Sequence, residues 1–213
     1  MLSNYYTIKQ DGSNQFIIQK SRFIGYVRRV ETEEAAQAFI QEIKKKHHDA
    51  NHNCSAYIIG EHDQIQKAND DGEPSGTAGV PILEVLKKQA LKDTAVVVTR
   101  YFGGVKLGAG GLIRAYGSAT SQAIEATGVV KRQLMQGISV TVDYTMLGKL
   151  ENEIRNSDYI LSKIDYLEKV ELLVYVQNGQ EQSFHDWIVD LTSNQATILN
   201  KDVTYIEIDT KKN

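Results

Sequence analysis

The order of apolar patterns in the second half of the chain constrains the fold more than any other feature of the sequence. Gly137–Tyr144 alternates between polar and apolar residues, as a half-buried strand does, and Met146–Asn156 after it has helical spacing. Together with three later strands and one later helix, they give the order βαββαβ, which is most simply a ferredoxin-like sandwich with two helices on one face of an antiparallel sheet. The remaining segments are Tyr159–Leu167, Val170–Gln177, Glu181–Leu191 and Ile198–Ile208.

The first half predicts mixed α and β structure. Gln15–Val30 is rich in Phe, Ile, Val and Tyr and predicts a strand with its flanks. Thr32 offers an N-cap for a helix that ends near Lys46, where Lys44–Lys46 place positive charge at the C-terminal end. Further expected elements are strands at Cys54–Ile59 and Thr94–Thr99 and helices at Ile82–Gln89 and Leu112–Ala126.

Glycine, proline and charge are distributed unevenly, which indicates two domains. Nine of the 16 glycines and both prolines lie between Gly72 and Gly117. Residues 1–136 include 17 basic and 14 acidic residues, net +3, whereas residues 137–213 include 7 and 13, net −6. We therefore expect one domain over residues 1–136 and a second over residues 137–213, with the polar stretch Thr127–Gln136 as the connector.

Composition and cysteine content limit the class of protein. Of the 213 residues 41% are hydrophobic and 24% charged, as in an average globular chain and unlike a disordered or collagen-like one. The lone Cys54 cannot form an internal disulfide, which favours a reducing compartment. No apolar run approaches the roughly 20 residues of a membrane helix, and Met1–Lys20 is too polar for a signal peptide. A soluble, cytoplasmic protein without a membrane partner is expected.

The glycine-rich stretch from Thr99 to Arg114 is the most informative motif. It runs from an expected strand into an expected helix, where free backbone N–H groups attract anions and Lys106 and Arg114 would add positive charge. It matches neither the P-loop nor the dinucleotide fingerprint, since Ile113 takes the place of the third glycine. The alternative is that these glycines only permit a tight turn and close packing of the helix.

Aromatic residues interleave with the basic ones in the same stretch. Arg100, Tyr101 and Phe102 suit a nucleic-acid backbone with unstacked bases. Tyr116 shares helical spacing with Leu112 and is expected in the core.

A second segment, Asp70–Pro81, places three carboxylates in a turn ahead of a helix. Such a cluster could hold Mg²⁺ or act as a general base. The alternative is a solvated turn in which Thr77 caps the helix, and Ser75 has no nucleophile elbow around it. The residues of interest are Asp70, Asp71, Glu73, Ser75 and Thr77.

Histidine and cysteine side chains raise a metal hypothesis, because His52 and Cys54 would share one face of a strand. The spacing matches no familiar site. The competing interpretation makes His47 and His48 a solvated helix end and Cys54 a small buried hydrophobe. We expect neither a metal nor a cofactor.

Lys20–Gly25, Asp70–Gly79 and Val98–Leu112 together resemble the signature of the IMPACT family. They cover the first half, and the βαββαβ half is similar to the C-terminal domain of bacterial two-domain members. The resemblance implies an N-terminal fold like the second domain of a small-subunit ribosomal protein and a C-terminal fold like a terminal domain of elongation factor G. Eukaryotic members are linked to control of translation through a scaffold protein that activates the general-control kinase. The family offers no established catalytic residues.

The leading hypothesis is therefore an α+β, non-catalytic RNA- or ribosome-associated protein that regulates translation, with a translation-associated protein as a further partner. A nucleotide- or phosphate-binding enzyme, either phosphotransferase or hydrolase, is the alternative, since related folds hold nucleotide phosphates on glycine-rich loops. A third hypothesis is a protein-binding module whose acidic C-terminal domain docks a basic partner. The residues expected to contact phosphate or RNA are Arg22, Arg100, Tyr101, Lys106, Gly108, Gly110, Gly111 and Arg114.

Overall fold

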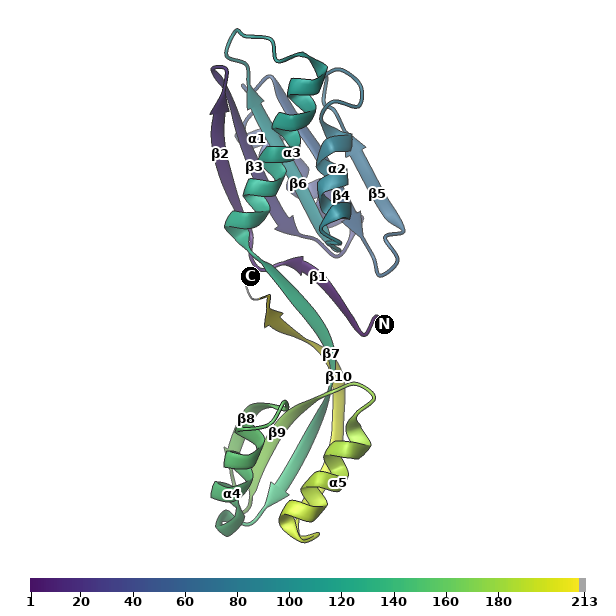
Figure 1. Cartoon of the computed structure of the whole chain (residues 1–213), viewed down its shortest axis with the longest axis vertical. Coiled ribbons are helices and arrows are strands. Elements are labelled where there is room, and N and C mark those ends of the chain that lie inside the picture. The colour runs from purple at the N-terminus through teal and green to yellow at the C-terminus, as the bar shows by residue number, and fades with distance from the viewer. Residues whose placement is uncertain (211–213) are drawn as a thin grey trace. The chain divides into compact units, whose positions relative to one another are not determined.

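The computed structural model describes residues 1–210, which form two compact units (Figure 1). The glycine-rich unit comprises Tyr5–Lys131 together with Ile208–Thr210. The ferredoxin-like unit comprises Met1–Asn4 and Arg132–Glu207. Each unit has its own hydrophobic core, which confirms the α+β organisation expected from the sequence.

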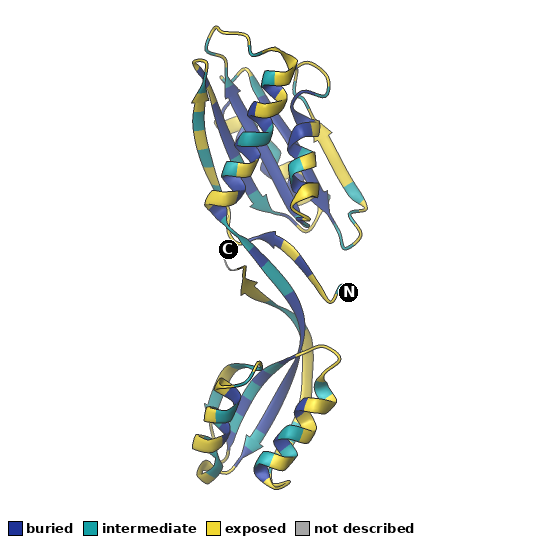
Figure 2. Cartoon of the chain, in the orientation of Figure 1, coloured by how far each residue is buried: buried dark blue, intermediate teal, exposed yellow. Residues whose placement is uncertain are grey.

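The glycine-rich unit is built on a five-stranded antiparallel sheet with the strand order β2-β3-β6-β4-β5. The inner strands β4 and β6 are buried along almost their whole length because helices cover both faces of the sheet (Figure 2). Its elements are β2 Gly12–Ile18, β3 Ser21–Arg29, α1 Glu33–Lys46, β4 His52–Ile59, β5 Ile65–Asn69, α2 Gly79–Lys88, β6 Thr94–Tyr101 and α3 Gly108–Thr127.

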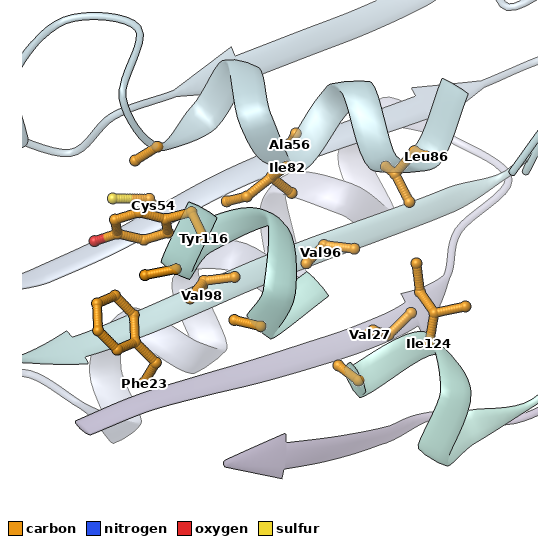
Figure 3. Packing of buried hydrophobic residues seen from close by; sticks show 14 of the residues in the cluster. Phe23, Val27, Cys54, Ala56, Ile82, Leu86, Val96, Val98, Tyr116 and Ile124 are labelled. Atoms are coloured by element: carbon orange, nitrogen blue, oxygen red, sulfur yellow. The ribbon is translucent and has the colours of Figure 1, made fainter. Parts of the chain in front are cut away.

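Two hydrophobic clusters separate the faces of this sheet. On one face, α1 packs Ala36, Phe39 and Ile43 against β4 and β6. On the other face, α2 and α3 cover a larger core that includes Phe23 and Tyr116 (Figure 3). The rings of Phe23 and Tyr116 meet edge to face with centroids 5.4 Å apart. The core therefore extends to the end of the sheet where the glycine-rich stretch begins.

The helices begin and end where local signals place them, with one correction of consequence. Thr32 caps α1 as predicted, its Oγ1 accepting the Ala35 N–H at 3.1 Å. Helix α3 begins at Gly108 rather than Leu112, so Gly108–Gly111 form its first turn and not a loop. Within residues 1–210, no helix is long and apolar enough to cross a membrane.

The sequence merges two strands of the glycine-rich unit into one and gives no sign of a third. Gln15–Val30 is a hairpin rather than one strand, because Gln19 and Lys20 turn the chain with φ of 43° and 67°. Glycine usually supplies positive φ, so nothing in the sequence marks this turn. Strand β5 was not predicted, since most of its residues are exposed and polar.

The ferredoxin-like unit has the predicted βαββαβ order. Strand β7 lies between β9 and β10, and β8 pairs with the far side of β9. Both helices contribute to one core, which also takes the inward residues of β7 and β9. Its elements are β7 Val129–Val142, α4 Tyr144–Arg155, β8 Ile160–Tyr166, β9 Val170–Gln177, α5 Glu181–Thr192 and β10 Thr197–Asp209.

The expected connector is not a loop. Residues from Val129 to Gln136 belong to β7, which also pairs with the N-terminal strand β1 (Asn4–Ile8). The division into units falls inside this strand, at Arg132. Independent folding of domains split near Gly137 stays a prediction.

Candidate functional site

The three sequence motifs meet at one end of the sheet in the glycine-rich unit. Strand β3 starts beside the end of β6, with Arg22 opposite Tyr101 and Phe23 opposite Arg100. The Ser21 hydroxyl accepts the Gly103 N–H at 3.2 Å. A Cβ on Gly103 would overlap the backbone of Lys20, so this glycine is required for the close approach. The start of β3 and the glycine-rich stretch after β6 therefore form one continuous surface at this end of the sheet.

Arg100 lies beneath this structure and does not reach solvent. Its guanidinium donates to the Glu73 carboxylate at 2.6 Å, and the two side chains are only 6% and 3% exposed. Tyr116 donates its hydroxyl to the same Glu73 oxygen at 2.8 Å. This geometry therefore gives no support to Arg100 as a phosphate contact or to Glu73 as a metal ligand or base, and both roles stay untested predictions. A charge pair so buried must be satisfied internally.

Cys54 and His52 lie beside this ion pair and do not form a metal site. The Cys54 thiol donates to the Asp70 carbonyl, and burial raises its pKa to about 12, so it is not a thiolate at neutral pH. The His52 Nδ1 is 2.9 Å from the Asp71 carbonyl oxygen. Among residues 1–210 no cluster of His, Cys, Asp or Glu is arranged to hold a metal ion.

The other carboxylates of the acidic segment also have structural partners. Asp70 accepts the backbone N–H groups of Gly76, Ala78 and Gly79 at 2.8–3.0 Å. These bonds outweigh burial and lower the Asp70 pKa. Asp71 pairs with Lys44 and accepts a backbone N–H from β4. These contacts of Asp70 and Asp71 are therefore all made within the fold.

The cap of α2 was assigned to the wrong residue. Asp70, not Thr77, accepts the N–H groups at the start of α2, and the buried Thr77 hydroxyl donates to the Pro74 carbonyl at 2.6 Å instead. Ser75 is exposed in the turn.

The start of α3 keeps the features of an anion site. No side chain caps the helix, and its first turn contains no acidic residue. Lys106, just before the helix, and Arg114, nearly two turns inside it, are both exposed. The free N–H groups of a helix start carry partial positive charge. We call Lys106, Gly108, Gly110, Gly111 and Arg114 the helix-start site.

The glycines of the helix-start site differ in what they do. A Cβ on Gly111 would lie 3.0 Å from the Leu107 Cβ, so packing explains that glycine. Gly108 has φ of +69°, a backbone conformation that disfavours side chains. A Cβ on Gly110 would meet only the Arg114 side chain, at 3.6 Å. Packing therefore does not account for Gly110, which leaves an open approach to the backbone.

Arg22 and Tyr101 lie on the opposite face of the sheet from Phe23 and Arg100, because side chains alternate along a strand. The Arg22 guanidinium carbon lies 4.3 Å from the centroid of the Tyr101 ring. The residues expected to contact phosphate or RNA therefore lie in three places: the helix-start site, the buried Arg100, and the pair of Arg22 and Tyr101.

His47 holds Tyr101 in place, which the sequence did not indicate. Its side chain is buried rather than part of a solvated helix end, and its Nδ1 lies 2.8 Å from the Tyr101 hydroxyl. Asp49 accepts a hydrogen bond from the same hydroxyl at 3.0 Å. His48 is exposed as expected. No motif marks His47 because its partners come from β3 and β6, far away in sequence.

Comparison with known proteins matches residues 19–124 to the Impact N-terminal domain and residues 140–195 to a domain of unknown function, DUF1949. IMPACT family member YvyE of Bacillus subtilis is 56% identical over 207 residues, 97% of this chain and 95% of the relative. IMPACT family member YigZ of Escherichia coli is 37% identical over 151 residues, 67% of this chain and 74% of the relative. A crystal structure of a hypothetical protein is similar with a TM-score of 0.61 and 29% identity, covering 95% of this chain and 99% of that one. The chain therefore belongs to the IMPACT family.

Proposed function

We propose that this protein is a non-catalytic, RNA- or ribosome-associated regulator of translation that binds a phosphate backbone at the helix-start site. The observation that carries the proposal is the uncapped, glycine-lined start of α3, flanked by the exposed cations Lys106 and Arg114. The role in translation rests on the family resemblance described above.

The surface beside this site favours a polymer over a single small anion. A groove of about 430 Å³ between α2 and α3 is lined by Arg114 and by Lys88, together with the small residues Gly117, Ser118 and Ser121. Two cations along one groove match the repeated charges of a nucleic-acid backbone. Small side chains allow that backbone to approach the helix.

The enzymatic alternative has less support. Its metal would need Asp70, Asp71 or Glu73, and the contacts of all three carboxylates lie within the fold. The protein-binding alternative, expected from the acidic C-terminal domain, gains a second surface from exposed apolar side chains near the helix-start site, with Phe102 45% and Ile113 45% exposed. It is the outcome to accept if RNA does not bind.

The test uses the full chain and fluorescence anisotropy with labelled hairpin and single-stranded RNA over a salt series. Replacing Lys106 or Arg114 with Ala should weaken binding to all RNA sequences and lower the slope of log affinity against log salt by roughly one unit per contact. Arg155→Ala is the matched control, because Arg155 is also exposed and lies on a helix of the ferredoxin-like unit.

Two results would overturn the proposal. One is the absence of RNA binding by the wild-type protein at low salt. The other is undiminished affinity of the double variant Lys106→Ala, Arg114→Ala with its thermal stability retained.

A further inference from the structure

Arg22 differs from the other arginines in this part of the sheet. Arg28 lies on the same face of β3 as Arg22 and pairs with both Asp11 and Glu42. Arg100 pairs with Glu73. Arg22 has no carboxylate partner within residues 1–210, and it is exposed. Its charge is therefore available to a ligand.

The guanidinium of Arg22 lies over a ring that is fixed in position. The Tyr101 hydroxyl makes two hydrogen bonds, donating to Asp49 at 3.0 Å and lying 2.8 Å from His47 Nδ1. Because its one proton goes to Asp49, the bond from His47 must be an Nδ1–H donated to the Tyr101 oxygen. The ring is thus held at its polar end, and Arg22 covers its face.

The other side of the His47 ring completes the chain of hydrogen bonds. With Nδ1 protonated, the neutral imidazole accepts at Nε2 from the Tyr26 hydroxyl, 2.6 Å away. The Asn53 side chain donates to the His47 carbonyl at 3.2 Å. Burial, followed by the charge of Lys46, lowers the His47 pKa, in keeping with the neutral ring. His47 therefore ties β3 and β6 to the end of α1.

The surroundings of Arg22 combine apolar surface and positive charge. Ile17 pairs with Arg22 across the β2–β3 hairpin and is 70% exposed. The Lys46 ammonium lies 4.8 Å from the centroid of the Tyr26 ring. A guanidinium plane and apolar surface can contact an unpaired base, and a nearby cation can contact the phosphate of the same nucleotide.

We propose that Arg22, supported from below by Tyr101, stacks on an unpaired base of RNA, with His47 as a positioning residue. The inference rests on the RNA binding proposed above and adds a preference for single-stranded segments. The helix-start site supplies the contact to phosphate, whereas Arg22 supplies a plane for a base.

The experiment measures binding of the full chain to an unstructured RNA that contains 2-aminopurine and to a blunt RNA duplex. Arg22→Lys keeps the charge and removes the plane. Binding to the wild type should quench 2-aminopurine fluorescence as the base stacks on Arg22. The Arg22→Lys variant should bind the unstructured RNA about 5- to 150-fold more weakly, with the same salt slope and without this quenching. Binding to the duplex should not change.

Arg28→Lys is the matched control. Arg28 also lies over a ring, with its guanidinium carbon 4.5 Å from the Phe39 centroid, but its charge is already neutralised by two carboxylates. This variant should bind both RNAs like the wild type. Tyr101→Phe keeps the ring and loses both hydroxyl bonds, so it should reduce the quenching without altering the salt slope.

The outcomes separate the two proposals. If Lys106→Ala and Arg114→Ala weaken binding while Arg22→Lys retains both affinity and quenching, base stacking by Arg22 is wrong and the phosphate site stands. Equal losses on duplex and unstructured RNA, with a lower salt slope, would make Arg22 a simple phosphate contact and also overturn stacking. If the wild type binds neither RNA, both proposals fail.

Discussion

Replacing Arg100 with Met should destabilise the glycine-rich unit rather than weaken ligand binding directly. The change leaves the Glu73 carboxylate, 3% exposed, with the Tyr116 hydroxyl as its hydrogen-bond partner and the His52 ring 3.9 Å away. Removing one member of a buried ion pair usually destabilises a protein by about 3 to 5 kcal/mol. With a urea m-value of roughly 2 kcal/mol/M, the unfolding midpoint should fall by about 2 M.

The assay follows urea unfolding by far-UV circular dichroism and by tryptophan fluorescence. Trp187 is the chain's one tryptophan and packs against Tyr159 and Phe184 in the ferredoxin-like unit. If the units unfold separately, the Arg100→Met variant should shift the dichroism transition of the glycine-rich unit and leave the fluorescence midpoint unchanged. A common shift would contradict independent domains.

A double variant shows whether the pairing itself is responsible. Adding Glu73→Gln to Arg100→Met removes the stranded charge, so the double variant should be more stable than Arg100→Met alone. The reasoning is refuted if Arg100→Met unfolds at the wild-type urea concentration. Weaker RNA binding with a lower salt slope in such a stable variant would return Arg100 to the list of phosphate contacts.

The remaining predictions concern glycines, the cap of α2 and pH. Gly103→Ala should lower the melting temperature sharply because a Cβ there meets backbone, whereas Gly110→Ala should leave stability nearly unchanged and weaken RNA binding. Asp70→Asn should lower the free energy of unfolding by about 1 to 2 kcal/mol in urea titrations, because weaker acceptance of three N–H groups uncaps α2. Burial, with Lys46 and Arg22, lowers the His47 pKa, so the unfolded chain takes up this proton first as pH falls. Stability should therefore decline below about pH 6.5, and His47→Gln should show a smaller decline in urea midpoints between pH 7.5 and 5.

Local patterns predicted most helices and the order of the ferredoxin-like unit. The spacing of Ala36, Phe39 and Ile43 and the Thr32 cap depend only on neighbouring residues, and both appear as expected. The two helices and four strands of the second half likewise follow from periodicity within each segment.

The functional site could not be predicted to the same extent, because burial depends on distant partners. Arg100 and Arg114 both lie in the glycine-rich stretch, and nothing in the local sequence distinguishes them. Arg100 is buried against Glu73, which comes from another segment, whereas Arg114 is exposed. His47 follows a run of lysines that suggests solvent, yet Tyr26 and Tyr101 enclose it. Contacts between residues far apart in the sequence produce no periodic pattern of apolar and polar residues, so they cannot be predicted from periodicity.

The path of the chain between the units also sets the order in which the protein can fold during synthesis. The Ser3 carbonyl accepts the Leu134 N–H at 2.9 Å, and the Tyr205 hydroxyl donates to the Leu2 carbonyl at 2.8 Å, so Leu2 and Ser3 must wait for residues made much later. The glycine-rich unit waits as well, since Thr210 donates to the Val129 carbonyl at 2.7 Å. Such distant pairings slow folding. Both units should therefore reach their final form only after Tyr205 and Thr210 have left the ribosome.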